Sequence, residues 1–250
     1  MRMRGMLAGL VAVTLLAGCG GGPADDADDT VTVFAAASLT DVFTTLAEEF
    51  ERDRPGTTVR LTFAGSSALA NQIVQGAPAD VFASAAPAPM RTVTDAGHGD
   101  GEPVVFARNQ LVIAVPKGNP AGVAGLADLV KPGVKVALCA EQVPCGAAAR
   151  TALDAAGVPL TPVTLEQDVR GALSKVTLGE VDAALVYRTD VGSTDTVQGV
   201  EFPESAGAVN DYPVVVLADA PNPSGARAFV EHVRSARGRA ALTAAGFQVP

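Results

Sequence analysis

The chain has 250 residues, and 48% of them are hydrophobic, which is enough to bury the core of one large domain or two modest ones. Its formal net charge is −9, and this acidic balance argues against nucleic acid as a partner. An anionic ligand would therefore have to be attracted by local dipoles, because the net charge repels it.

The N-terminal segment has the pattern of an export signal. Two arginines precede an apolar run, Met6 to Leu16, and the sequence LAGC then ends at Cys19. This pattern predicts a signal peptide at residues 1–18, too short to span a membrane as a mature helix. Its end resembles the lipobox of bacterial lipoproteins, which makes Cys19 the expected lipidation site; an incidental cysteine in an ordinary cleaved signal is the alternative. Residues 19–29, rich in Gly and Asp, predict a flexible tether.

After the tether, short β-branched runs alternate with helical segments, which is typical of mostly parallel sheets covered by helices on both faces. The expected strands are Val31–Phe34, Thr58–Phe63, Asp80–Ala83, Leu111–Val115, Val134–Leu138, Ala183–Val186 and Val214–Leu217. The expected helices are Thr40–Arg52, Ser66–Gln75, Pro87–Ala96, Gly146–Ala156, Val169–Leu178, Ser224–Ser235 and Gly238–Ala245. The predicted fold class is α/β.

The strand LVIAV at residues 111–115 is followed by PKGNP, which indicates that the chain passes there from one lobe to another. We predict that residues 30–108 and 192–250 form lobe 1 and that residues 109–191 form lobe 2. The C-terminal third returns to lobe 1 because its strand and two helices are too few for a domain. Two lobes joined by two crossings form a hinged clamp, with the ligand outside the C-terminal ends of strands.

Four predicted strand-to-helix turns share one character: AAASLTD from residue 35, FAGSSALA from 63, CAEQVPCGAAAR from 139 and LEQDVRGAL from 165. Each places hydroxyls or bare N–H groups at a helix start. Capping alone explains any one of them. Because two fall in each lobe, they would face each other across the cleft, and their partial positive charges could offset much of a dianion.

In their order and spacing, VTVFAAASLTD, FAGSSALANQI, GAPADVFASA, VPCG, DVRGAL and ALVY resemble the molybdate-binding proteins of ABC importers. The resemblance covers nearly all of the mature chain. It implies the two-lobed periplasmic binding protein fold, class II-like, and a tetrahedral ligand, molybdate or tungstate, with no cofactor. It further implies a monomer that delivers its ligand to an ABC permease and is held by Cys19 on the outer face of the cell membrane.

The resemblance also implies a set of ligand-binding residues. The family's oxyanion contacts fall on Ser38, Ser66, Cys145, Val169 and Tyr187. The two serines would donate hydroxyl and main-chain N–H bonds, Cys145 and Val169 main-chain N–H bonds only, and Tyr187 its phenolic O–H. Alanine is usual at the position of Cys145, and a backbone contact should survive this change. From the sequence alone, Tyr187 can equally be the buried end of a strand.

A set made only of donors suits an unprotonated oxyanion, whereas the proton of hydrogen phosphate needs an acceptor. Sulfate would have to be rejected by size, so sulfate and phosphate remain the alternative ligands. Asp41 and Asp168 lie near the turns and are interpreted as helix N-terminal residues that interact with the dipole. Arg170 and Arg188 are interpreted as surface residues, paired with Asp168 or Asp190.

Cys139 and Cys145 are expected to form a disulfide in the exported protein, with two free buried thiols as the alternative. A secreted enzyme would need Cys145 or Ser66 as nucleophile and His232 as base, and nothing in the sequence brings His232 close. Since His98 and His232 lie far apart and no metal-binding spacing is present, no direct metal ligand is expected. Molybdenum would be held only as molybdate.

Overall fold

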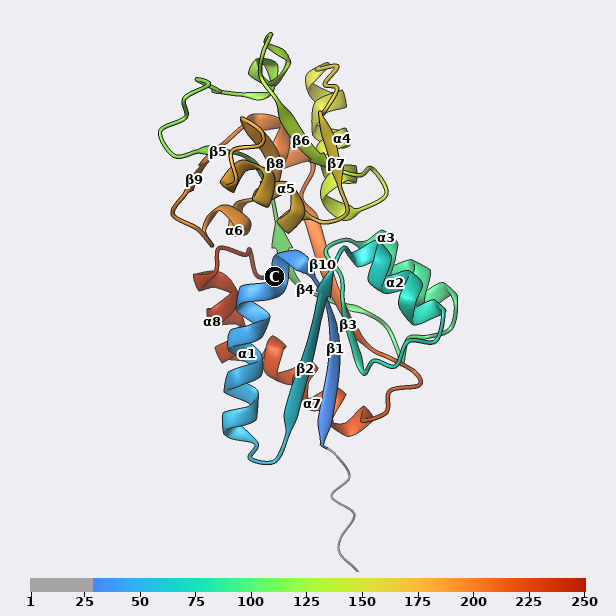
Figure 1. The fold of residues 1–250 in the computed structure, drawn as a ribbon. Coiled ribbons are helices and arrows are strands. Elements are labelled where there is room, and N and C mark those ends of the chain that lie inside the picture. Colours follow the sequence, from blue (N-terminus) through green and yellow to red (C-terminus); the bar gives the residue numbers. More distant parts are fainter. Residues whose placement is uncertain (1–28) are drawn as a thin grey trace, which may run out of the picture.

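The computed structural model describes residues 29–250, which form two lobes, each built on a five-stranded sheet (Figure 1). The predicted signal peptide, Cys19 and all of the predicted tether except Asp29 lie outside the described residues. Within residues 29–250, no helix is long and apolar enough to cross a membrane.

The sheet of lobe 1 has the order β2-β1-β3-β10-β4. Its strands are β1 Thr30–Ala36, β2 Thr58–Ala64, β3 Val81–Ala83, β4 Val104–Asn109 and β10 Asn210–Val216. Its helices are α1 Thr40–Asp53, α2 Ser66–Val74, α3 Pro87–Asp95, α7 Pro223–Arg234 and α8 Ala236–Ala244, and the 3-10 turn η1 Ala37–Leu39 precedes α1.

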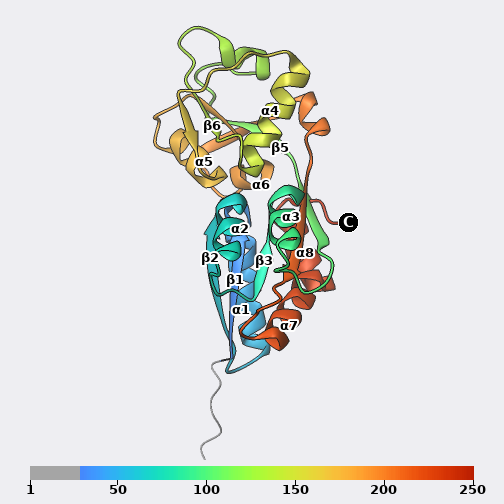
Figure 2. The ribbon, with the colours of Figure 1, turned by 90° about the vertical axis from the view of Figure 1, so that its right-hand side faces the viewer.

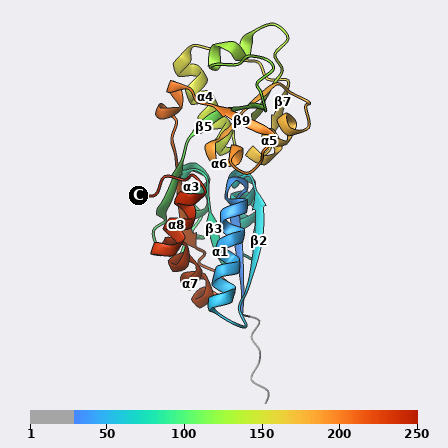
Figure 3. The same cartoon turned by 90° about the vertical axis from the view of Figure 1, so that its left-hand side faces the viewer.

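The alternation of side chains along β1 explains why both faces of this sheet are covered. Val31 and Val33 point to one face, where they pack with α1, α7 and α8 in one core cluster. Phe34 points to the other face and packs with α2 and α3 in a second cluster. The two helical layers are seen from opposite sides in Figures 2 and 3.

The sheet of lobe 2 has the order β7-β6-β8-β5-β9 and one continuous core. Its strands are β5 Leu111–Pro116, β6 Val136–Cys139, β7 Thr164–Glu166, β8 Ala183–Tyr187 and β9 Val197–Val200. Its helices are α4 Pro144–Ala156, α5 Val169–Thr177 and α6 Arg188–Val191, and it carries the 3-10 turns η2 Leu126–Val130 and η3 Pro203–Gly207.

The predicted two-lobed α/β fold is confirmed, and two details differ from the prediction. Each sheet is mixed, because β10 and β5 run antiparallel to both of their neighbours while the other pairings are parallel. The return crossing also lies later than residue 191. Residues 197–200 form β9, which pairs with β5 of lobe 2, so the chain leaves lobe 2 between β9 and β10.

Candidate ligand-binding site between the lobes

A small cavity lies between the lobes, where the C-terminal ends of strands meet the starts of helices. Its walls include all five residues predicted to bind the ligand: Ser38, Ser66, Cys145, Val169 and Tyr187. The space left for the centre of a water-sized sphere is about 10 Å³. The cavity therefore suits a small compact ligand, and an extended organic molecule does not fit.

Ser38 is placed by η1, directly after β1, and its side chain is buried. Its Oγ lies 2.9 Å from Tyr212 Oη. Burial raises the pKa of the Tyr212 phenol well above its usual range, so Tyr212 keeps its proton and can donate it to Ser38 Oγ. The Ser38 hydroxyl then has its own proton to donate into the cavity. Tyr212 was not predicted as a site residue.

Ser66 is the first residue of α2 and is only 1% exposed. Its Oγ accepts a hydrogen bond from Ala85 N at 2.9 Å, which leaves its proton free for a ligand. The preceding Gly65 allows the lobes to approach, because a Cβ there would lie 2.3 Å from Gln167 O of lobe 2. Glycine is thus required by the close contact of two backbones.

Side-chain caps are missing at three of the four helix starts around the cavity. The residues before η1, α2 and α4 make no side-chain cap hydrogen bond. Only α5 is capped, by Asp168, whose Oδ1 accepts from Gly171 N at 2.9 Å. The first N–H groups of a helix have no partner within it. Since capping does not satisfy these groups at α2 and α4, they can bind an anion.

Cys145 lies in the first turn of α4 and forms the predicted disulfide with Cys139, which is the last residue of β6. The next residue, Gly146, packs so tightly that a Cβ would lie 2.0 Å from Ala140 O. The bridge and this contact both hold the start of α4 against the end of β6. The main-chain N–H of Cys145 is therefore kept at a fixed position on the cavity wall.

Tyr187 ends β8 and is 1% exposed, so the two readings of this residue hold together: it is a buried strand end and a wall of the cavity. Its Oη is buried and makes no hydrogen bond of good geometry among the described residues, with the Tyr212 phenol as a polar neighbour. Burial raises the pKa of this phenol well above its usual range, so it stays a donor. A buried hydroxyl without a partner is costly unless a ligand accepts from it.

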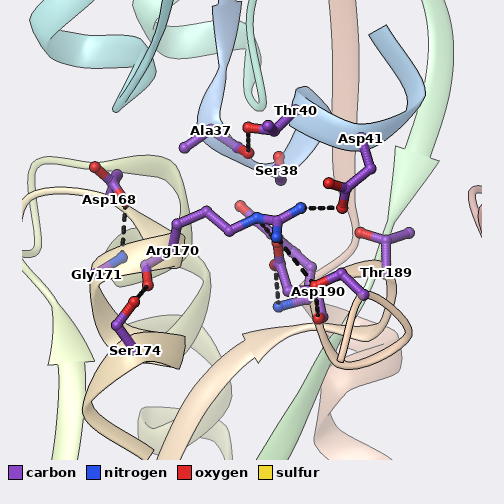
Figure 4. Close-up of polar contacts among 12 residues, drawn as sticks. Ala37, Ser38, Thr40, Asp41, Asp168, Arg170, Gly171, Ser174, Thr189 and Asp190 are labelled. Carbon is purple, nitrogen blue, oxygen red and sulfur yellow. Dashed lines mark hydrogen bonds and ion pairs between the residues drawn. The ribbon is translucent and has the colours of Figure 1, made fainter. Parts of the chain in front are cut away.

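Charged residues lie at the rim of the cleft rather than in its walls, with Asp168 as the exception (Figure 4). The Arg170 guanidinium pairs with Asp41 of lobe 1 and lies 3.4 Å from Asp190, measured from Nε to Oδ1. Asp190 was predicted as a partner, but on the surface, and this part of the prediction is wrong because Asp190 is fully buried. The pairing with Asp41 was not predicted. Arg188 pairs with Glu201 instead of Asp190.

The residues of the enzyme alternative do not come together. Cys145 is tied up in the disulfide, and Ser66 Oγ has Ala85 N as its partner. His232 lies on α7 beside Glu49, with 3.9 Å between Nε2 and Oε2, and is not part of the cavity. No group of three or more His, Cys, Asp or Glu side chains within residues 29–250 is arranged to hold a metal ion.

Comparison with known proteins agrees with this geometry. The family model for bacterial extracellular solute-binding proteins matches residues 31–248. The molybdate-binding protein ModA of Mycobacterium tuberculosis is 46% identical over 262 aligned residues, which cover 100% of both chains. ModA of Escherichia coli is 32% identical over 230 residues, with 88% of this chain and 89% of the relative covered.

Two solved structures show the same fold. The periplasmic molybdate-binding protein of Azotobacter vinelandii has a TM-score of 0.78 at 21% identity, with 88% of this chain and 99% of that chain covered. The sulfate-binding protein SubI of Mycobacterium tuberculosis has a TM-score of 0.77 at 18% identity, with 88% and 86% covered. The resemblance found in the sequence motifs is confirmed, and the relatives are solute-binding proteins rather than enzymes. The chain belongs to the family of bacterial extracellular solute-binding proteins.

Proposed function

We propose that the protein captures molybdate, and also tungstate, in the interlobe cavity and delivers it to an ABC permease. The relatives at 46% and 32% identity are molybdate-binding proteins, and they carry the ligand as cargo rather than as a cofactor. The mature protein would be a monomer on the outer face of the cell membrane, held there by acyl chains on Cys19.

One observation carries the choice of ligand: the five predicted contact residues line one small cavity. Four of them come from the four turns, two in each lobe, and the fifth is at the end of β8. What they offer is donors, namely the hydroxyls of Ser38, Ser66 and Tyr187 and the N–H groups at uncapped helix starts. Molybdate, tungstate and sulfate accept on every oxygen and carry no proton at neutral pH. Hydrogen phosphate would need an acceptor. The one carboxylate that residues 29–250 contribute to the cavity wall, Asp168, uses its Oδ1 to cap α5, which leaves Oδ2 as the only carboxylate oxygen there that could take this role.

Isothermal titration calorimetry of the mature protein with molybdate, tungstate, sulfate and phosphate tests the function. We expect tight binding of molybdate and tungstate, much weaker binding of sulfate, and none of phosphate. The Ser38→Ala and Ser66→Ala variants should bind less tightly. Ser205→Ala is the matched control, because Ser205 is also fully buried, but its Oγ donates to Phe202 O and accepts from Gln110 Nε2, away from the cavity. A preference for phosphate, or equal losses in all three variants, would overturn the assignment.

Mass spectrometry of the protein from membranes tests the anchor. A diacylated or triacylated N-terminal Cys19 is the expected result, and a mature chain that begins elsewhere would exclude it.

A further inference from the structure

Four side chains from both lobes meet at the rim of the cleft (Figure 4). Arg170, on α5 of lobe 2, extends its guanidinium across the cleft to Asp41, on α1 of lobe 1. On its own side it donates to Ser193 Oγ at 3.0 Å and lies 3.4 Å from Asp190 Oδ1. One guanidinium thus joins carboxylates that belong to different lobes.

Arg170 is held in place before it reaches across. Asp190 is 0% exposed, and a carboxyl group buried so deeply either binds a proton or needs a cation such as Arg170 nearby. Within lobe 2, Arg170 is held by its hydrogen bond to Ser193 Oγ and by its contact with Asp190. An ion pair between two freely moving surface side chains stabilises little, because both must be ordered. Here only the exposed Asp41 has to be ordered when the pair forms.

The same residues are connected to three parts of the cavity wall. Arg170 follows Val169 in the chain, and Asp190 Oδ2 accepts a hydrogen bond from Tyr187 N at 3.1 Å. On the other lobe, Asp41 lies in the first turn of α1, which begins directly after the η1 turn that carries Ser38. The Arg170–Asp41 pair therefore lies next to groups that face the cavity from both lobes.

We propose that Arg170 is an interlobe latch, a positioning residue that holds the cleft closed over the ligand by bridging Asp190 to Asp41. That the ligand is molybdate rests on the proposed function, whereas the latch depends only on the contact between the two lobes. The lobes also touch through uncharged groups, since Ser67 Oγ donates to Gln142 O at 2.6 Å. The ion pair is the part of this contact that salt can weaken.

Asp41→Asn is the most informative variant, because Asp41 is 61% exposed and its removal leaves Arg170 paired with Asp190. Removing Arg170 instead would also remove its contacts with Ser193 and Asp190 within lobe 2, so its effect would not be specific to the contact between the lobes. The matched control is Asp53→Asn on the same helix, α1. Asp53 is similarly exposed at 51%, and it pairs with Arg237 of α8, within lobe 1.

Stopped-flow release of molybdate should be about fivefold or more faster for Asp41→Asn. The association rate is measured separately, because removing a rim carboxylate also favours the approach of an anion. Asp41→Glu should restore most of the slow release, and Asp53→Asn should match the wild type. Raising the salt concentration should speed release from the wild type toward that of Asp41→Asn. Equal release rates for Asp41→Asn and the wild type would overturn the latch.

Small-angle X-ray scattering separates this outcome from a failure of the proposed function. If another oxyanion binds in place of molybdate, the rates are measured with that ion, and only the ligand assignment fails. If none binds, Asp41→Asn should still have a larger radius of gyration than the wild type and Asp53→Asn. Identical radii for all three proteins in that case would contradict the latch itself.

Discussion

Replacing Tyr187 by Phe removes one hydroxyl from the cavity wall and leaves the ring in place. Because Tyr187 Oη makes no hydrogen bond of good geometry among the described residues, its loss leaves no protein group unpaired. A hydrogen bond to a charged group contributes about 1.5 to 3 kcal/mol. The dissociation constant for molybdate should therefore rise by about 10- to 150-fold, while the free energy of unfolding without ligand stays the same or rises slightly.

Calorimetry gives the affinity, and urea denaturation of the ligand-free protein gives the stability. Tyr212→Phe is the matched control, because Tyr212 is equally buried but its Oη lies 2.9 Å from Ser38 Oγ. That variant should lose stability by about 1 kcal/mol as well as affinity. Unchanged affinity in Tyr187→Phe would refute a ligand contact at Oη, and a clear loss of ligand-free stability would show that the hydroxyl has a structural partner.

Three further outcomes follow from the contacts at the cleft. In Gly65→Ala the added Cβ would lie 2.3 Å from Gln167 O of lobe 2, so closure of the two lobes should be hindered. Calorimetry should then show weaker ligand binding, while the melting temperature of the ligand-free protein stays nearly unchanged. Replacing both cysteines of the disulfide by serine should lower the free energy of unfolding, measured by urea denaturation, by only about 2 kcal/mol, since the loop that the bridge closes is short. The same variant should bind the ligand less tightly, because the start of α4 is no longer fixed. Burial raises the pKa of Asp190 to about 7, although Arg170 acts against it, while Asp41 and Asp168 add to the rise. As pH increases from about 4 to 7, the unfolded state loses this proton and the folded state keeps it, so the contribution of Asp190 to stability should fall. In urea denaturation across this range, the free energy of unfolding should fall less for Asp190→Asn than for the wild type. Identical pH dependence of the two proteins would refute the shift.

The sequence predicted the elements whose own residues carry a strong pattern. Seven strands and seven helices agree in place with the structure, because apolar runs and helix-start residues mark them. Three strands were missed, and all three lie at sheet edges. Two have weak local signals: β7 has three residues with Leu165 exposed, and β9 contains Gly199. The third, β4, begins with the apolar run Val104–Phe106, so its pattern was present and was overlooked. The helix α6 is a single turn. Edge strands such as β7 and β9 bury little, so hydrophobic periodicity does not reveal them.

The candidate site likewise contains residues that the sequence could predict and residues that it could not. Ser38, Ser66 and Tyr187 stand at strand ends, which the sequence pattern marks, and the family motifs selected them from other helix starts. Tyr212 supports Ser38 from 174 residues away, and Asp41 meets Arg170 across 129 residues. Such contacts depend on how the lobes close, and no local pattern records that. The chain has only two tyrosines, and this is the one signal that could have drawn attention to Tyr212.

The distribution of charge around the cavity separates recognition of the ligand from closure. The carboxylates of Asp41 and Asp168 outnumber the guanidinium of Arg170 at the rim and wall, so long-range attraction does not favour an anion there. The ion must be held at short range, by hydroxyls and N–H groups whose hydrogen bonds are shielded from salt once the cavity is closed. The exposed Asp41 side of the Arg170 bridge remains open to screening. Salt should therefore act on how long the lobes stay closed, while the choice among oxyanions stays nearly constant.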